Sequence, residues 1–278
     1  MSQFFSSGGG GGTASPLTTK GDLYTYDTDN TRLPRGVLTS DLVMTSSNMS
    51  SWSNTSSTDL SVFVEDIWFE NANWQQSIYG VGSKITSDGS QPTSGHPGIV
   101  DLETGTDTNG GAAIRRGLGG QWVLNNGAYM MDYIIKIPVL ADVTDDFVFT
   151  IGLATTMSSS SAVGDCPGSN AVFFKYIRSS SVNWTAGTHA SSSETLSTGG
   201  SSVAVDTNWT HLRSTVNADA TEVEFFVNGT SIGTVTTNIP SAGMGVGMVI
   251  KKTAGTTERE AYADYLKIVQ NISPSRFS

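Results

Sequence analysis

The chain has 278 residues, of which only 14% are charged, and its formal net charge is −10 at pH 7. This acidic balance argues against a nucleic-acid partner, because duplex binding depends on neutralising phosphates. No apolar run reaches the roughly 20 residues of a membrane-spanning helix, so we expect no membrane insertion. Low charge combined with many Thr, Val and aromatic residues favours strands and turns over long helices.

The first 15 residues form a glycine-rich N-terminal arm that contains the run Gly8–Gly12. Such a run is flexible when it is free, but without side chains it can also lie in a narrow groove of a partner. A docking arm and a plain linker both fit this composition. The arm lacks the basic start and the apolar stretch of a signal peptide, so we expect no export by that route.

Residues 16–45 are expected to form a small β module that is too short to bury a core alone. The strings LTTKGDLY, from Leu17 to Tyr24, and TRLP, from Thr31 to Pro34, resemble a module found in phage tail-fibre and other virion proteins. The resemblance implies docking on other virion proteins, in the capsid or the tail, and assembly as a homotrimer. The assembly contacts are expected from Leu17, Leu23, Tyr24, Tyr26, Leu33 and Pro34.

A Ser/Thr-rich linker over residues 46–60 leads to the large domain, residues 61–278, with the boundary expected near Ser57. That domain is organised around Thr221–Val235, two predicted strands joined by Asn228-Gly229. Asn-Gly favours positive φ at both central positions of a hairpin turn. Between Ser94 and Gly105 we expect a long loop. Further strands are expected at Phe63–Glu70, Ala112–Arg116, Tyr129–Val139, Phe147–Leu153, Ala171–Arg178, Trp209–Val216, Glu222–Val227, Ser231–Thr236, Met248–Lys252 and Glu260–Val269.

Three strings of the large domain carry a second resemblance: HPGIVDLETGT from His96, AVFFKY from Ala171 and VEFFVNG from Val223. With the link at residues 237–240 and the last strand, they resemble a concanavalin-A-like lectin/glucanase domain common in phage structural proteins. The resemblance implies an all-β jelly-roll sandwich of two antiparallel sheets in a virion component. It does not by itself imply sugar binding, because one fold serves many functions.

Strand alternation suggests one ligand-binding patch. In the strands predicted around Tyr133 and Phe174, the apolar rows are expected to face the core, which leaves other residues pointing outward. An outward patch of cations beside an aromatic ring would suit an anionic glycan or an acidic neighbour. Separate solvated charges explain the same residues. The patch would consist of Arg115, Lys136, Phe173 and Lys175.

Acidic residues supply the catalytic and metal candidates. Glycosidases of this fold need two facing carboxyl groups, and neither Glu222-Val-Glu224 nor Glu258-Arg-Glu260 with Asp264 has the full pattern. We therefore expect no catalytic residues and no enzyme activity. Calcium needs six to eight oxygen ligands, whereas short acidic loops are also ordinary solvated turns. We expect no cofactor, with calcium as an alternative at two acidic stretches: Asp101, Glu103 and Asp107, and Asp145-Asp146.

Three functions remain open at this stage. The first is a structural or decoration protein of a phage capsid, head fibre or tail fibre that docks by its N-terminus. The second is a receptor-binding lectin that holds host-surface carbohydrate. The third is a polysaccharide depolymerase. The virion assignment implies a product made in the host cytoplasm and released by lysis.

Overall fold

The computed structural model describes residues 41–44, 50–53, 59–66, 74–87, 96, 98–117, 120–157 and 168–272. The chain divides into two compact units, Met1–Ser57 and Thr58–Ser278. In the first unit, β1 (Asp41–Met44) and β2 (Ser50–Ser53) pair antiparallel, and β2 lies within the segment expected to be a linker. The N-terminal arm and all the predicted assembly residues lie outside the described residues: Leu17, Leu23, Tyr24, Tyr26, Leu33 and Pro34.

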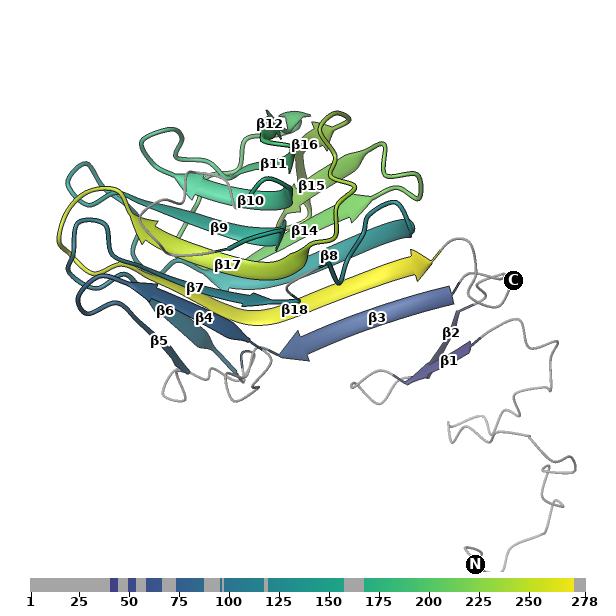
Figure 1. Ribbon diagram of the computed structural model, residues 1–278, viewed down its shortest axis with the longest axis horizontal. Helices are drawn as coiled ribbons and strands as arrows, with labels where there is room; N and C mark the ends of the chain where they lie inside the picture. The colour runs from purple at the N-terminus through teal and green to yellow at the C-terminus, as the bar shows by residue number, and fades with distance from the viewer. Residues whose placement is uncertain are drawn as a thin grey trace, which may run out of the picture. The chain divides into compact units, whose positions relative to one another are not determined.

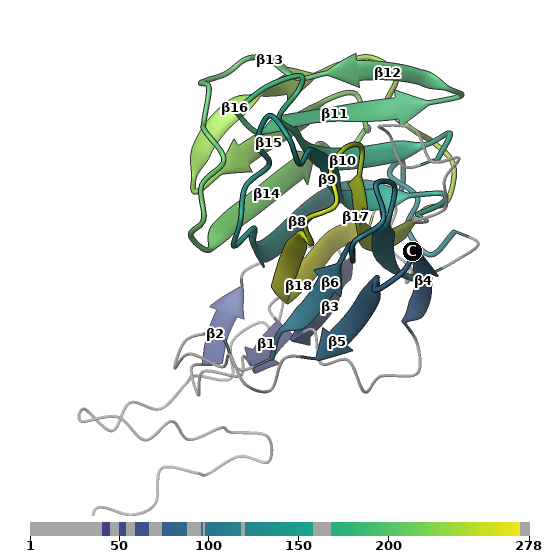
Figure 2. The same cartoon turned by 90° about the vertical axis from the view of Figure 1, so that its left-hand side faces the viewer.

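The second unit is a sandwich of two antiparallel sheets that lie face to face (Figures 1 and 2). The seven-stranded sheet has the order β12-β11-β10-β9-β17-β7-β4. Its strands are β4 (Gln75–Tyr79), β7 (Gly111–Arg116), β9 (Phe147–Ala154), β10 (Ala171–Ile177), β11 (Thr185–Ala190), β12 (Ser193–Leu196) and β17 (Gly245–Lys252).

The nine-stranded sheet has the order β13-β16-β15-β14-β8-β18-β6-β5, and β3 pairs with β18. All described elements are strands, which confirms the all-β jelly-roll sandwich expected from the sequence. Its strands are β3 (Asp59–Asp66), β5 (Lys84–Ser87), β6 (Val100–Glu103), β8 (Gly127–Lys136), β13 (Thr198–Gly199), β14 (Thr210–Val216), β15 (Val223–Val227), β16 (Thr230–Val235) and β18 (Glu260–Ile272).

The β15–β16 hairpin confirms the prediction made from its Asn-Gly turn. Asn228 and Gly229 have φ values of 49° and 79°, and Val227 pairs with Thr230 across a two-residue loop. Alternate residues of β15 are buried, as its apolar row predicts. Because period-2 alternation places one row of side chains on each face, that row lines the interior of the sandwich.

Aromatic side chains from both sheets fill the core between them. Phe174 of β10 and Phe225 of β15 meet edge to face, with ring centroids 5.4 Å apart. Trp184, just before β11, packs against Phe149 and Tyr176 with centroid distances of 6.2 and 6.4 Å. Burying such side chains stabilises a fold by about 2–3 kcal/mol each, so these layers hold the two sheets together.

Eight of the described strands were not predicted from the sequence: β1, β2, β4, β5, β6, β11, β12 and β13. The expectation of a long loop over Ser94–Gly105 was wrong, because β6 lies within it and pairs with β5 and β18. These strands are short, and most are rich in polar or small residues. β1 pairs with β2 and β11 with β12 through short connections, whereas β4, β5, β6 and β13 pair with strands that are more distant in sequence. For the second group, tertiary context outweighs local propensity.

The strand order gives the sandwich two lateral edges. We call the edge formed by β11, β12, β13 and β16 the cleft edge, and the edge formed by β4, β5, β6 and β7 the charged edge. The first lies at the top and the second at the bottom of the view in Figure 2.

Candidate functional site

The four residues of the predicted cationic patch do not share a face. Arg115 of β7 and Phe173 and Lys175 of β10 alternate with core residues, so they lie on the outer face of the seven-stranded sheet. Lys136 lies in β8, opposite Tyr262 of β18, on the outer face of the other sheet. The prediction of a single four-residue patch is therefore wrong. Lys136 lies on the nine-stranded sheet, whereas the other three residues lie on the seven-stranded sheet.

The three residues that do share a face are engaged within the protein. Phe173 is fully buried and packs in a small apolar cluster with Met157. Lys175 is only 6% exposed, its Nζ lies 3.2 Å from Glu194 Oε2, and it stands over the Phe173 ring. Arg115 donates hydrogen bonds to Gln75 Oε1 and to the Met157 carbonyl. These contacts account for the three side chains without any ligand.

An open cleft lies at the cleft edge, where the two sheets approach each other through β11, β12 and β13. Its volume is about 380 Å³, and no charged side chain lines it. Trp184, Ala186 and Ile232 are its buried apolar residues. The remaining lining is Ser181, Asn183, Thr185, Leu196, Ser197, Thr198, Gly199, Gly200, Ser201 and Ser202.

Backbone hydrogen bonds fix the walls of this cleft. The Trp184 amide donates to the Val203 carbonyl at 2.9 Å, and the Ser201 amide donates to the Ser231 carbonyl at 2.9 Å. A Cβ atom on Gly200 would come within 2.1 Å of backbone atoms of β16, so only glycine permits this close approach. The cleft is thus preformed, with both walls tied to strands.

Several polar groups of the cleft are available to a ligand. Within the described residues, the Asn183 side-chain amide and the hydroxyl groups of Ser201 and Ser202 make no hydrogen bond. Hydroxyl and amide groups each donate and accept hydrogen bonds, as the hydroxyl groups of a polyol require. Our sequence reasoning missed this site. Its signal is the pair of Ser/Gly/Asn-rich segments that precede β11 and follow β12.

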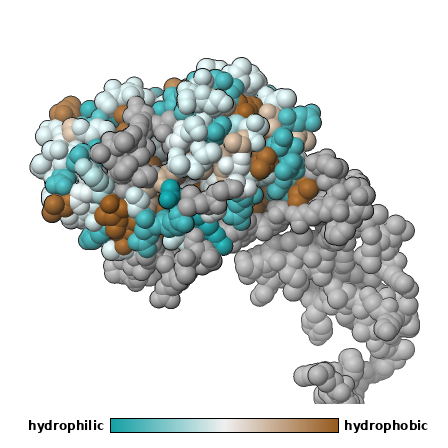
Figure 3. Space-filling model, viewed as in Figure 1, coloured by the Kyte–Doolittle hydropathy of each residue, from teal (hydrophilic) through white to brown (hydrophobic). Residues whose placement is uncertain are grey.

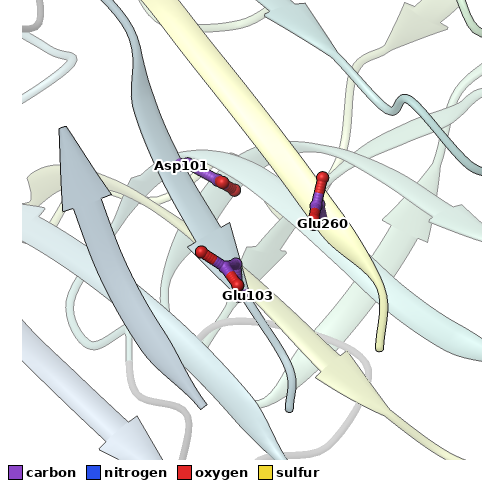
Figure 4. A group of neighbouring side chains, drawn as sticks. All are labelled: Asp101, Glu103 and Glu260. Carbon is purple, nitrogen blue, oxygen red and sulfur yellow. The ribbon is translucent and has the colours of Figure 1, made fainter. Parts of the chain in front are cut away.

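A second cluster lies at the charged edge, where three carboxyl groups from neighbouring strands converge (Figure 4). Asp101 and Glu103 of β6 and Glu260 of β18 each offer an oxygen within 4.8 Å of the others. Glu103 pairs directly with Glu260 across the strands, and its Oε2 lies 2.8 Å from Lys84 Nζ. Tyr262 donates a hydrogen bond to Glu260 at 2.7 Å.

The cluster brings together two of the predicted calcium ligands, Asp101 and Glu103, but not the third. Asp107 instead accepts a hydrogen bond from the Val81 amide at 2.7 Å. Three carboxyl groups fall short of the six to eight oxygens that calcium takes, and Lys84 already neutralises one of them. Oxygen ligands of this kind suit a hard cation, but these contacts alone do not define a metal site.

In the second predicted calcium stretch, the side chains of Asp145 and Asp146 accept hydrogen bonds from backbone amides of nearby turns. Asp145 Oδ1 accepts a hydrogen bond from the Thr257 amide at 2.8 Å, and Asp146 Oδ1 accepts one from the Phe147 amide at 3.0 Å. The hydrogen bond from Thr257 holds the pKa of Asp145 below its ordinary value. These carboxylates therefore act as acceptors for their own backbone.

The glycosidase candidates do not form one constellation. Glu224 of β15 accepts a hydrogen bond from Ser231, and β15 is separated from β18 by β14 and β8. Asp264 of β18 lies 2.7 Å from His96 Nδ1, and the His96 ring stacks on Trp209. Glu258 lies near Glu103, and burial followed by this like charge raises its pKa.

Comparisons with known proteins agree with this architecture. Peanut lectin superposes with a TM-score of 0.53 and 13% identity over 77% of this chain and 99% of that one. The carbohydrate recognition domain of Emp47p gives 0.49 and 11% identity over 79% and 99%. A carbohydrate esterase from Shiga toxin-encoding bacteriophage phi24B gives 0.44 and 11% identity over 72% and 90%. At these identities, the likeness to peanut lectin establishes the fold alone.

A comparison with curated protein sequences finds no match. A family model described as SO2946-like, C-terminal domain, matches residues 95–264, which run from just before β6 into β18. This match covers more than half of the chain and includes both walls of the cleft. The chain therefore belongs to the SO2946-like C-terminal domain family.

Proposed function

We propose that this chain is a carbohydrate-binding, lectin-like module that holds an uncharged saccharide in the cleft beside Trp184. The observation that carries the proposal is the composition of the cleft, which is lined by hydroxyl, amide and apolar groups and by no charged side chain. The sandwich fold shared with peanut lectin supports the same class of function.

The ligand class follows from the balance of polar groups. A saccharide presents many hydroxyl groups, and each must regain in the site the hydrogen bonds that it loses from water. The cleft offers such partners at Asn183, Ser201 and Ser202. An anionic sugar would find no cation in the lining, on a chain whose net charge is already −10. The volume of about 380 Å³ falls within the range of small-ligand sites.

A glycan array followed by calorimetry on the full chain tests the proposal. We expect binding to neutral glycans and a loss of at least about tenfold with Asn183→Ala, which removes an amide, or with Ser202→Trp, which fills the cleft. The matched controls are Asn271→Ala and Ser193→Trp, both exposed and outside the cleft. No binding to any glycan, or binding that the cleft variants leave unchanged, would contradict the proposal.

The finer functions implied by the phage resemblance stay predictions. Docking on a virion and assembly as a homotrimer were assigned to residues 1–45, most of which lie outside the described residues. Release by lysis follows from the expected virion role, and host-surface attachment was expected of the large domain that the virion would display. The expectation that the chain is not an enzyme is likewise a prediction, and release of sugar from a polysaccharide would contradict it.

A further inference from the structure

We propose that the cleft prefers saccharides that carry a methyl group, either at a deoxy position or in an acetyl substituent, and that Leu196 contacts this group. The inference rests on the function proposed above and adds the chemical class of the sugar. It follows from the uneven distribution of polar and apolar groups along the cleft.

The cleft is a gap between two segments of chain that are joined at both ends. At one end, the Trp184 amide donates to the Val203 carbonyl at 2.9 Å, and at the other the Ser197 amide donates to the Ala186 carbonyl at 2.8 Å. Between these points, β13 and Ser201 pair with β16 instead. The segments therefore separate in the middle, and the cleft has two distinct ends.

Polar groups that are free to bind a ligand lie at the end beside Trp184, which we call the polar end. Asn183 forms a β-bridge with Ala204, and Ser201 and Ser202 come just before that residue in the chain. The side chains of Asn183, Ser201 and Ser202 line the cleft and make no hydrogen bond within the described residues. They can therefore bind the hydroxyl groups of a sugar.

Hydroxyl groups at the other end are already engaged, and we call this the apolar end. Ser197 Oγ donates to the Ile232 carbonyl at 3.2 Å. Thr185 Oγ1, in β11, donates to the Lys175 carbonyl at 3.0 Å. Thr198, the next lining residue, belongs to β13, which pairs with β16 on the opposite wall. A ligand hydroxyl group at the apolar end therefore meets fewer free partners than one at the polar end.

Leu196 supplies accessible apolar surface at the apolar end. It is the last residue of β12, lines the cleft and is 41% exposed. It pairs with Gly187 of β11, and a Cβ added to that glycine would lie 3.2 Å from Leu196 Cδ2. The leucine side chain therefore lies against a residue that has no side chain of its own, and it keeps an exposed side for a ligand.

A methyl-bearing sugar matches this arrangement better than its hydroxylated parent. A hydroxyl group placed beside Leu196 would lose its hydrogen bonds to water without full replacement, which opposes binding. A methyl group there would bury apolar surface against the leucine, which favours binding. On the face seen in Figure 3, hydrophobic residues form separate spots among polar ones, so single apolar side chains, and not a broad apolar area, are available on that face.

Calorimetry with matched sugars on the full chain tests the inference. The sugars are glucose, galactose and mannose, each compared with its 6-deoxy form and with its 2-acetamido-2-deoxy form. We expect at least one methyl-bearing form to bind at least about fivefold more tightly than its parent, less than for a fully enclosed apolar group because Leu196 stays partly exposed. The two forms distinguish a deoxy methyl group from an acetyl group.

Two variants assign the preference to the apolar end. Leu196→Asn keeps the size of the side chain but makes it polar, so the preference should fall below about twofold, because the methyl group loses its apolar contact. The parent sugar should bind as before. Val143→Asn alters a side chain that is 85% exposed and outside the cleft, and it should leave the preference unchanged. Circular dichroism confirms that both variants are folded.

Equal affinities within every set of sugars, or a preference that Leu196→Asn leaves in place, would overturn this inference. Neither result affects the proposed function, which depends on the loss of binding with Asn183→Ala. Binding of no glycan at all by the wild-type chain would overturn both.

Discussion

The two lateral edges of the sandwich use polar residues in opposite ways. At the cleft edge, hydroxyl and amide groups line an open space, and some of their hydrogen-bonding capacity is left for a ligand. At the charged edge, ionised side chains form ion pairs and hydrogen bonds with one another and with the backbone. The contrast suggests that one edge is arranged for recognition, while the other carries an electrostatic cost within the fold.

The network around Arg259 adjoins the charged edge, because Arg259 bonds Thr104 just beyond the end of β6. Arg259 is buried, and its Nη2 lies 2.7 Å from Asp142 Oδ2. Nearby Lys252 is fully buried, and its Nζ makes no hydrogen bond within the described residues. Desolvation lowers the pKa of Lys252. A buried cation that lacks such a partner destabilises a fold, so this edge should respond to mutation differently from the cleft edge.

The largest expected effect is at the cleft edge, where stability depends on aromatic packing. Trp184→Ala removes a buried ring that contacts Phe149 and Tyr176. We expect the free energy of unfolding to fall by about 3–5 kcal/mol, because a cavity is left where the ring was. Urea denaturation measures this loss. Leu196→Ala, at an exposed position of the same cleft, should cost less than about 1 kcal/mol, and equal losses would contradict the packing argument.

Two glycines with positive φ allow the effect of backbone strain to be separated from that of a steric clash. Gly105 has φ +61°, and an added Cβ would meet Val81 O and Ser83 N at 2.3 Å. Gly229, in the β15–β16 turn, has φ +79° with nothing within 4 Å. Gly229→Ala should cost about 1–2 kcal/mol from left-handed strain alone. Gly105→Ala should cost about 3 kcal/mol or more, because a steric clash adds to that strain. Thermal denaturation that ranks the two variants in the reverse order would contradict this reading.

Mutation of Lys252 is expected to increase the stability of the protein, in contrast to the losses expected at Trp184 and at the two glycines. Lys252→Met should raise the free energy of unfolding at pH 7 by about 1–3 kcal/mol, because it replaces a desolvated ammonium group by an apolar chain of similar length. The lowered pKa means that the folded state binds this proton less tightly than the unfolded state. Wild-type stability therefore recovers as pH rises through the folded pKa toward 10.5, and the advantage of Lys252→Met should shrink. Urea titrations of both proteins at pH 7 and pH 10 measure the difference in their free energies of unfolding. A difference that grows with pH would contradict the desolvation argument.

Sequence reasoning succeeded where strands are long and strictly alternating. The rows around Tyr133, Phe174 and Phe225 predicted both the strands and their buried faces, because each strand alone carries the period-2 signal. Sequence reasoning did not predict the side-chain clusters or the cleft, because there residues from distant strands meet. Nothing local to Lys175 reveals Glu194, and nothing local to Asp101 or Glu103 reveals Glu260. The cleft was missed for a related reason, because its Ser/Gly-rich segments resemble ordinary loops until the sheets bring them beside Trp184.

The smallest expected effect concerns the carboxyl cluster at the charged edge. It depends on whether the carboxylates there repel one another. Burial and the neighbouring Glu103 raise the pKa of Glu258, so its ionisation opposes folding. This cost is complete above the folded pKa and vanishes below the unfolded value of 4.5, where the group is protonated in both states. Because Glu258 is exposed, solvent and salt screen the effect, and Glu258→Gln should stabilise the chain by only about 0.5 kcal/mol at pH 7. The gain should disappear near pH 4 and diminish in 1 M salt. Glu222→Gln, which alters an exposed carboxyl group just before β15 and far from this cluster in the strand order, should change nothing at either pH. If Glu258→Gln instead destabilises the chain at pH 7, the cluster attracts rather than repels, as it would if it held a cation.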